Sequence, residues 1–199
     1  MGTSLIYKSA ALYDAAMLVL YGRHYFSRYR AIAQLIPGGA SVLDVCCGPG
    51  NLYTRYLSKK NVSYVGLDMN RGFIDGLRSV GVDARIRDLR TEEPLPDAGY
   101  VVMQASLYHF LPDAAPVIDR LLRAADRQVI IAEPITNLTT SRIGILAKLG
   151  RRLTDSGHGA EALRFTEETL DALFENYHRS VKTSFLIPGG REKVFVLEK

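Results

Sequence analysis

The chain has 199 residues, of which 47% are hydrophobic and 23% charged, and these fractions exclude a disordered or collagen-like chain. The length fits one domain, and we find neither an uncharged apolar run of about 18 residues nor a signal-peptide pattern, so we expect no membrane span and no export. The net charge of +4 forms no dense basic stripe with interleaved aromatic residues, which argues against a nucleic-acid partner and leaves an anionic small molecule or a membrane surface open.

The first 134 residues predict a helical segment followed by an alternating α/β pattern. Residues 3–36 carry apolar side chains at helical spacing and end at Pro37-Gly38-Gly39. Beyond them we expect strands at 41–46, 62–67, 84–87, 100–104 and 128–132, with helices at 52–59, 72–80 and 114–125. Apolar strands separated by helices indicate a Rossmann-like, doubly wound parallel sheet covered on both faces, whose ligands bind beyond the carboxyl ends of the strands.

The segment 135–164 interrupts this alternation. Within it, residues 142–153 form an amphipathic basic stretch whose apolar face consists of Ile143, Leu146, Leu149 and Leu153. One interpretation is a lid helix over an acceptor pocket, and the other is a helix that rests on an anionic membrane surface.

The last 35 residues predict one helix and a hairpin. Thr166 is expected to be the N-cap of a helix that runs to about Asn176, with Thr169 as an imperfect third member of a capping box. The runs 181–187 and 193–198 flank a Pro-Gly-Gly turn, a pattern typical of a β-hairpin.

The main ligand-binding motif lies in residues 42–51, Val-Leu-Asp-Val-Cys-Cys-Gly-Pro-Gly-Asn. A buried strand leads into a glycine-rich turn, and a helix follows at once. Gly48 and Gly50 allow a ligand to approach the backbone, and the free N–H groups of the helix start favour a negatively charged group. No Lys-Ser/Thr pair follows, so the turn is not a P-loop.

Acidic residues lie at or near the ends of three successive predicted strands. Asp44 is in the first, Asp68 ends the second, and Asp88 closes the third. An acid at the end of the second strand is placed to accept hydrogen bonds from both ribose hydroxyls of a nucleoside. Asp88 is placed to accept one from an adenine amino group.

With these motifs, the chain resembles the class I S-adenosylmethionine-dependent methyltransferases, from about Val42 to the C-terminal hairpin. The resemblance implies a mostly parallel seven-stranded sheet with an antiparallel last strand, S-adenosylmethionine as cofactor, S-adenosylhomocysteine as product, and no metal. It implies cofactor contacts at Asp44, Cys46, Gly48, Pro49, Gly50, Asp68, Met69, Asp88, Leu89, Gln104 and Ala105, and at Tyr13 and Tyr25 of the N-terminal cover.

The segment from Gln104 to Asp113 resembles the fourth-strand region of family members that act on small molecules and quinone-like lipids. This resemblance makes His109 the candidate general base, since a neutral imidazole is available near physiological pH. Tyr108, Glu133 and His158 are candidate acceptor contacts, and Arg23 joins Tyr13 and Tyr25 as a candidate lid residue.

Two departures from common patterns bear on this interpretation. Cys46 stands where the family often has glycine, and Tyr53 replaces the third glycine of a dinucleotide-binding fingerprint. The missing third glycine argues against a dinucleotide, and the resemblance implies methyl transfer to an oxygen or carbon of a small-molecule or lipid-like acceptor. The first alternative is a non-catalytic nucleoside-binding protein of the same fold, and the second is a dinucleotide-dependent oxidoreductase.

We expect one methyltransferase domain over residues 1–199. It comprises a helical cover (1–37), a cofactor-binding half (38–134), a lid-like insertion (135–164), and the last helix with the hairpin (165–199). The adjacent Cys46 and Cys47 are expected to be reduced thiols in a cytoplasmic protein, because neighbouring cysteines make a strained pairing. The sequence leaves open a monomer or a homodimer and a peripheral membrane contact.

Overall fold

The computed structural model describes residues 14–15, 17–19, 22–135 and 164–199. Their central element is a seven-stranded sheet with the order β3-β2-β1-β4-β5-β7-β6. Five strands pair in parallel: β1 (Ser41–Val45), β2 (Ser63–Asp68), β3 (Ala84–Ile86), β4 (Ala98–Gln104) and β5 (Ala125–Pro134). The strand β7 (Glu192–Glu198) is antiparallel to β5 and to β6 (Val181–Leu186). The predicted doubly wound sheet with an antiparallel last strand is therefore confirmed.

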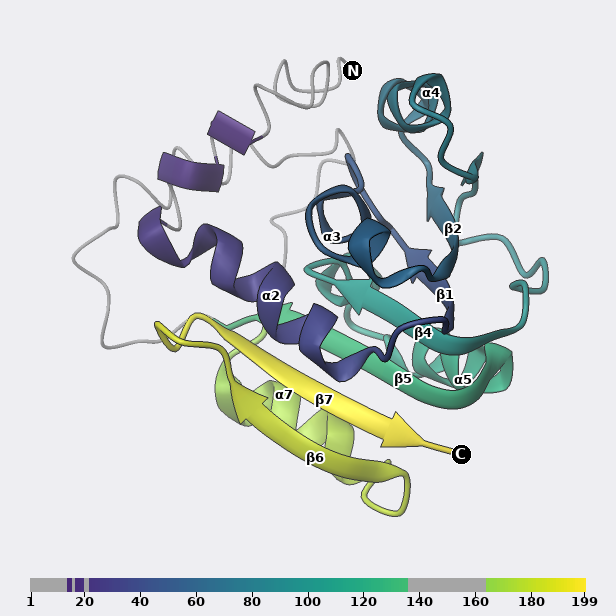
Figure 1. Ribbon diagram of the computed structural model, residues 1–199. Coiled ribbons are helices and arrows are strands. Elements are labelled where there is room, and N and C mark those ends of the chain that lie inside the picture. Colours follow the sequence, from purple (N-terminus) through teal and green to yellow (C-terminus); the bar gives the residue numbers. More distant parts are fainter. Residues whose placement is uncertain (1–13, 16, 20–21, 136–163) are drawn as a thin grey trace, which may run out of the picture.

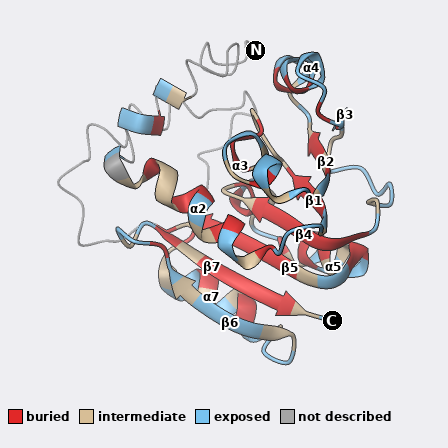
Figure 2. Cartoon of the chain, viewed as in Figure 1, coloured by how far each residue is buried: buried red, intermediate tan, exposed pale blue. Residues whose placement is uncertain are grey.

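Helices cover both faces of this sheet (Figure 1). One face carries α2 (Tyr25–Leu35), α3 (Asn51–Arg55) and α4 (Arg71–Ser79), which bury Ile32, Leu52 and Ile74 against it. The other face carries α5 (Ala115–Ala124) and α7 (Glu167–Glu175), which bury Ile118 and Phe174. The central strands are buried along almost their whole length (Figure 2), as expected for a sheet covered on both sides.

The helix predicted over residues 52–59 is divided in the structure. The α-helix α3 ends at Arg55, and a 3₁₀ turn, η3 (Leu57–Lys60), follows it. Tyr56 leaves the helical region with φ −128°, and its hydroxyl donates to the carbonyl of Phe26 in α2. The break thus ties α3 to the N-terminal helix, a long-range contact that periodicity does not report.

The capping of α7 agrees with the sequence prediction. Thr166 Oγ1 accepts from the backbone N–H of Thr169 at 3.2 Å, and Thr169 Oγ1 accepts from the N–H of Thr166 at 2.9 Å. This helix leads into β6, and β7 then pairs with both β6 and β5. The first residue of β7, Glu192, pairs with Pro134 at the carboxyl end of β5. Within the described residues no helix is long and apolar enough to cross a membrane.

Candidate functional site

The turn after β1 holds its backbone in the left-handed region. Cys46, Gly48 and Gly50 have φ values of 58°, 55° and 72°. Glycine adopts this region without steric cost, which accounts for Gly48 and Gly50, whereas Cys46 adopts it with a side chain. The Cys47 N–H donates to the carbonyl of Leu67 at 2.9 Å and so anchors the turn to β2. Neither Cys46 nor Cys47 is part of a disulfide.

The two glycines of this turn face different surroundings. Among the described residues, a Cβ atom on Gly48 would meet no heavy atom within 4 Å, whereas one on Gly50 would lie 2.5 Å from Cδ2 of Leu77 in α4. Gly50 therefore allows α3 to pack closely against α4. Gly48 leaves open space above the tip of β1, where the main chain itself can approach a ligand.

Asp68, at the end of β2, lies directly beside this turn. Its Oδ2 accepts from the N–H of Gly48 and its Oδ1 from the N–H of Asn70, both at 2.8 Å. Burial raises the pKa of the Asp68 carboxyl, and these N–H groups oppose that shift. Each carboxylate oxygen keeps a second lone pair for a ribose hydroxyl. The next residue, Met69, is 50% exposed and offers an apolar surface beside the carboxylate.

Asp88 lies two residues beyond β3 on the same edge of the sheet. Its carboxylate accepts from the Arg90 N–H at 3.0 Å and from Arg90 Nη2 at 2.7 Å. The neighbouring Leu89 carbonyl accepts from Nη1 of Arg120 in α5 at 2.6 Å. These bonds fix the loop after β3, and the adenine contact predicted for Asp88 and Leu89 stays a prediction.

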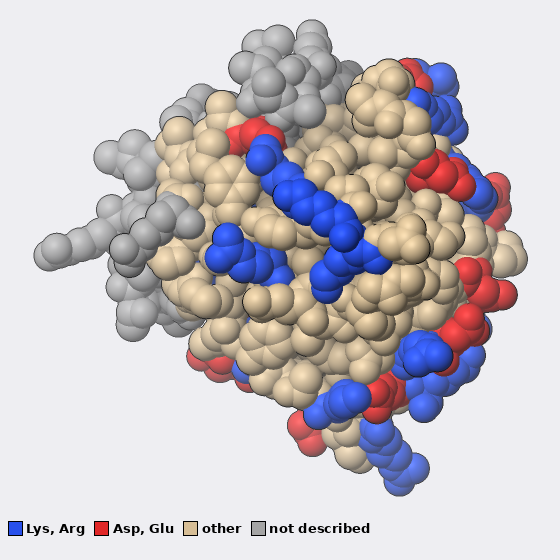
Figure 3. All heavy atoms as spheres, viewed as in Figure 1, with Lys and Arg blue, Asp and Glu red and all other residues tan. Residues whose placement is uncertain are grey.

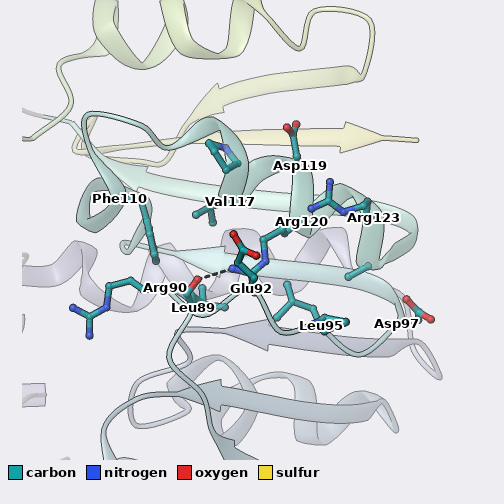
Figure 4. Close-up of a pocket in the computed structure, with 13 residues that line it drawn as sticks. Leu89, Arg90, Glu92, Leu95, Asp97, Phe110, Val117, Asp119, Arg120 and Arg123 are labelled. Carbon is teal, nitrogen blue, oxygen red and sulfur yellow. Dashed lines mark hydrogen bonds between the residues drawn. The ribbon is translucent and has the colours of Figure 1, made fainter.

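A cavity of about 820 Å³ lies between this loop and α5 (Figure 4). Leu89, Leu95, Phe110 and Val117 form part of its apolar lining. Leu89 is its only lining residue that the sequence predicted as a cofactor contact, so the cavity is distinct from the space above Gly48.

Asp44 lies inside the sheet, with 3% of its surface exposed. The hydroxyl of Tyr64 donates to its Oδ2 at 2.8 Å. Burial raises the pKa of Asp44 to about 7; the hydrogen bond from Tyr64 lowers it, and the charge of Asp68 adds to the increase. A cationic ligand group near Asp44 would stabilise the ionised carboxylate.

The N-terminal segment is tied to the start of α3 by a hydrogen-bond network. Asp14 Oδ1 accepts from the hydroxyl of Tyr25 and from Nδ2 of Asn51, both at 2.7 Å, and Asp14 Oδ2 pairs with Arg55 at 2.9 Å. Asn51 directly follows Gly50, so the cover is anchored beside the glycine turn. The side chain of Tyr25 is fully buried in this network. Tyr13, His158, the side chain of Arg23 and the stretch 142–153 lie outside the described residues.

The basic side chains of α3 and η3 form part of a stripe on this face of the molecule (Figure 3). Arg55 pairs with Asp14, as described above. Lys60 Nζ donates to the carbonyls of Ala33 and Ile36, both at 2.6 Å, and thereby caps the end of α2. Arg55 and Lys60 in this stripe therefore stabilise the fold through contacts within the chain.

Glu133, near the end of β5, holds the segment that follows β4. It is fully buried, and it accepts from the N–H groups of Ser106, Leu107 and Tyr108 at 3.1, 3.0 and 3.4 Å. Burial raises the pKa of Glu133 to about 8, against the effect of these bonds. The carboxylate caps the 3₁₀ turn η4 (Leu107–Phe110), and an acceptor contact for Glu133 stays a prediction.

Two aromatic rings and an arginine lie together at η4. The exposed His109 ring is 4.0 Å from the Tyr108 ring, and the guanidinium carbon of Arg164 lies 3.4 Å from the centre of that phenol ring. Ala105, the residue directly after β4, has a φ of 53°. The structure thus presents His109 to solvent beside β4, on the edge of the sheet where the glycine turn lies.

A buried ion pair joins the cover helix to the hairpin at this edge. Arg28 Nη2 in α2 lies 2.7 Å from Oε1 of Glu192, and both side chains are 2% exposed. Gln104 Nε2, at the end of β4, lies 3.4 Å from Oε2 of Glu192. The three side chains come from distant parts of the chain and meet beyond the carboxyl ends of β4 and β5.

The sequence of the chain matches the model of a known protein family. The model of the family described as "Methionine biosynthesis protein MetW" matches residues 27–156, more than half of the chain. The chain belongs to the MetW family. The match runs from the N-terminal helix through the glycine turn and β5.

Curated relatives of this MetW-family chain are methyltransferases by name. It is 32% identical over 114 residues to a trans-aconitate 2-methyltransferase of Mycobacterium ulcerans, an alignment that covers 56% of this chain and 43% of the relative. It is 37% identical over 106 residues to the enzyme of the same name from Mycolicibacterium gilvum, covering 52% and 39%. The chain therefore spans less than half the length of these relatives.

Solved structures confirm the fold. Magnesium protoporphyrin IX methyltransferase of Synechocystis, determined with bound S-adenosylhomocysteine, aligns over 98% of this chain and 96% of its own, with a TM-score of 0.66 and 16% identity. A TehB-like S-adenosylmethionine-dependent methyltransferase of Corynebacterium glutamicum aligns over 95% and 96%, with a TM-score of 0.62 and 18% identity. The MetW-family chain thus has the predicted class I methyltransferase fold.

The structure brings several predicted site residues to one edge of the sheet. Gly48 contacts Asp68 directly, and Cys46, Gln104 and Ala105 lie at the tips of the neighbouring strands β1 and β4. Sequence reasoning did not identify Asn51, Arg28, Glu192 or Arg164. Asn51 is the last residue of the glycine-rich motif and was within reach of a sequence argument, whereas the other three are brought here by the tertiary fold.

Proposed function

We propose that the chain is an S-adenosylmethionine-dependent methyltransferase that acts on a small-molecule acceptor at oxygen or carbon. The observation that carries the proposal is the turn after β1, where open space above Gly48 adjoins the Asp68 carboxylate. The methyltransferase names of the curated relatives support the activity. Because those relatives act by name on trans-aconitate, they also support a small acceptor rather than a macromolecule.

The residues at this edge fit an adenosyl cofactor with a cationic amino-acid end. Asp68 keeps lone pairs for the ribose, Met69 offers an apolar surface for the base, and the left-handed turn admits a ligand against the main chain. Asp44 supplies a carboxylate beneath the turn, suited to an ammonium group. Asp44, Gly48, Asp68 and Met69 would therefore hold S-adenosylmethionine.

When bound, this cofactor supplies a methyl group on a positively charged sulfur, and an in-line displacement transfers that methyl to the acceptor. The chain's contribution is to bind the acceptor, align it and exclude water. His109 is the proposed base for an acceptor that must lose a proton, because it is exposed beside the tip of β4. Glu133 fixes η4, on which His109 lies, through three backbone hydrogen bonds.

Two measurements test the proposal. The first is a thermal shift with S-adenosylhomocysteine and, separately, with NADH; we expect only the former to raise the melting temperature, by about one degree or more. The second is transfer of a labelled methyl group from S-adenosylmethionine to a small-molecule extract. Stabilisation without transfer would favour a non-catalytic nucleoside-binding protein, and stabilisation by NADH alone would favour an oxidoreductase.

A further inference from the structure

A tyrosine of β2 orients the buried Asp44 carboxylate. Asp44 lies in β1 between Gly66 of β2 and Val102 of β4. Two residues after Val42, it shares the face of the sheet that α2, α3 and α4 cover. The Tyr64 hydroxyl donates to its Oδ2 at 2.8 Å, and among the described residues its Oδ1 accepts no hydrogen bond. Tyr64 thus fixes one carboxylate oxygen and leaves the other for a ligand group.

Packing holds the phenol of Tyr64 in place. Its buried ring stacks on Tyr53 of α3, with 4.3 Å between the ring centres and 28° between the ring planes. Gly66 provides room for the hydroxyl, because a Cβ atom there would lie 3.2 Å from it and 3.0 Å from Sγ of Cys47. Burial raises the pKa of Tyr64 well above its usual value, so the hydroxyl remains a donor at physiological pH.

The titratable side chains around Asp44 come from the neighbouring strands, the turn and the covering helices. They include Tyr64 and Asp68 of β2, Tyr100 of β4, Cys46 and Cys47 of the turn, Tyr53 of α3 and Arg28 of α2. Burial raises the pKa of Asp44 to about 7, the hydrogen bond from Tyr64 lowers it, and the charge of Asp68 raises it. Arg28, the cation of this set, pairs with Glu192. Among the described residues, Tyr64 is therefore the group that favours the ionised form of Asp44.

We propose, on the basis of the methyltransferase function, that Tyr64 is a positioning residue that keeps the Asp44 carboxylate ionised and directed at the ammonium group of S-adenosylmethionine. Tyr64 acts through Asp44, because its buried hydroxyl contacts that carboxylate. A hydrogen bond to the charged form of a buried acid stabilises that form. The pH range over which the chain binds its cofactor is thus set in part by a tyrosine that lies beneath the site.

A purely packing role for Tyr64 predicts a different behaviour. Tyr64→Phe keeps the ring and its stacking on Tyr53, and removes only the hydroxyl. If Tyr64 only fills space under α3, this change should lower cofactor affinity equally at every pH, or at none. If the hydroxyl stabilises the Asp44 carboxylate, the loss should be confined to the pH range in which Asp44 becomes protonated.

The test is calorimetric titration of the full chain with S-adenosylhomocysteine between about pH 6 and 8.5. In Tyr64→Phe we expect the affinity profile to move upward by about one pH unit. The affinity at pH 7 should then fall about five-fold, whereas at about pH 8.5 it should stay within about two-fold of the unsubstituted chain. An unchanged profile, or a loss of equal size at every pH, would overturn the proposal.

Further variants locate the effect. Tyr100→Phe is the matched control: it removes the hydroxyl of a buried tyrosine opposite Val42 in β4 and should leave the profile unchanged. The double variant Asp44→Asn, Tyr64→Phe should bind as Asp44→Asn alone does, because Tyr64 acts through Asp44. An additional loss in the double variant would contradict this.

Gly66→Ala tests the same contact while Tyr64 is retained. Its methyl group would crowd the Tyr64 hydroxyl, so the profile should move in the same direction by a smaller amount. A profile that stays in place in both Gly66→Ala and Tyr64→Phe would exclude Tyr64 as the positioning residue. Failure of the unsubstituted chain to bind S-adenosylhomocysteine at any pH would instead refute the methyltransferase function.

Discussion

The two halves of the sheet edge are built differently. Beyond β1 and β2, main-chain groups and carboxylates surround open space, as Gly48 and Asp68 show. Beyond β4, β5 and β7, charged side chains from distant segments are buried against one another, as in the pair Arg28–Glu192. The first half suits the cofactor, and its residues can be predicted from a local sequence motif. The second half depends on long-range packing, and this is where we place the acceptor.

The largest expected effect is on the buried pair. Glu192→Ala leaves the Arg28 guanidinium buried without its carboxylate and should lower the free energy of unfolding by about 3–5 kcal/mol. Urea denaturation measures it. The double variant Arg28→Met, Glu192→Leu should recover most of the loss, because it removes both charges. The exposed pair is the control, and Asp83→Ala should cost about 0–1 kcal/mol. An equal, small cost at both pairs would contradict the comparison.

The two glycines of the turn should separate packing from ligand binding. Gly50→Ala places a methyl against Leu77 and should lower stability by about 1–3 kcal/mol, in addition to about 1–2 kcal/mol for its left-handed φ. Gly48→Ala should lower stability only through its left-handed φ. Its methyl group would enter the open space, so it should also reduce the affinity for S-adenosylhomocysteine. Denaturation and calorimetry on both variants check this. Undiminished affinity in Gly48→Ala would mean that the ligand lies elsewhere.

Removing the ribose acceptor should weaken cofactor binding. Asp68→Ala should reduce the affinity for S-adenosylhomocysteine by about 1.5–3 kcal/mol, the range for hydrogen bonds to a charged group. Calorimetry measures this, with Asp83→Ala as an exposed control outside the site. An unchanged dissociation constant in a folded Asp68→Ala variant would refute the ribose assignment.

The smallest effect is a pH dependence through Asp44. Because its pKa is raised to about 7, the carboxylate ionises between pH 6 and 8, and affinity for the cationic end of S-adenosylhomocysteine should rise over that range by up to about ten-fold. The same raised pKa means that the ligand-free chain loses stability as pH rises from the usual carboxyl range to about 7. Asp44→Asn should flatten both profiles, as calorimetry and denaturation across pH will show. A pH dependence that persists in the Asp44→Asn variant would show that another group causes it.

The sequence predicts the first half of the edge well because its determinants are local. The strand, the left-handed turn and the following acid all lie within residues 41–68, and the Thr166–Thr169 cap is local too. Arg28 and Glu192 lie at opposite ends of the chain, and only the antiparallel return of β7 brings them together. The left-handed Ala105 carried no signal either, because alanine rarely adopts that conformation. Tertiary packing decides these features.

The most direct test of the central claim is a crystal structure of the chain with S-adenosylhomocysteine. The account predicts density for the ligand above Gly48, with both ribose hydroxyls on Asp68 and the amino-acid end toward Asp44. Ligand density in the cavity lined by Leu95 and Val117, with the space above Gly48 empty, would contradict it.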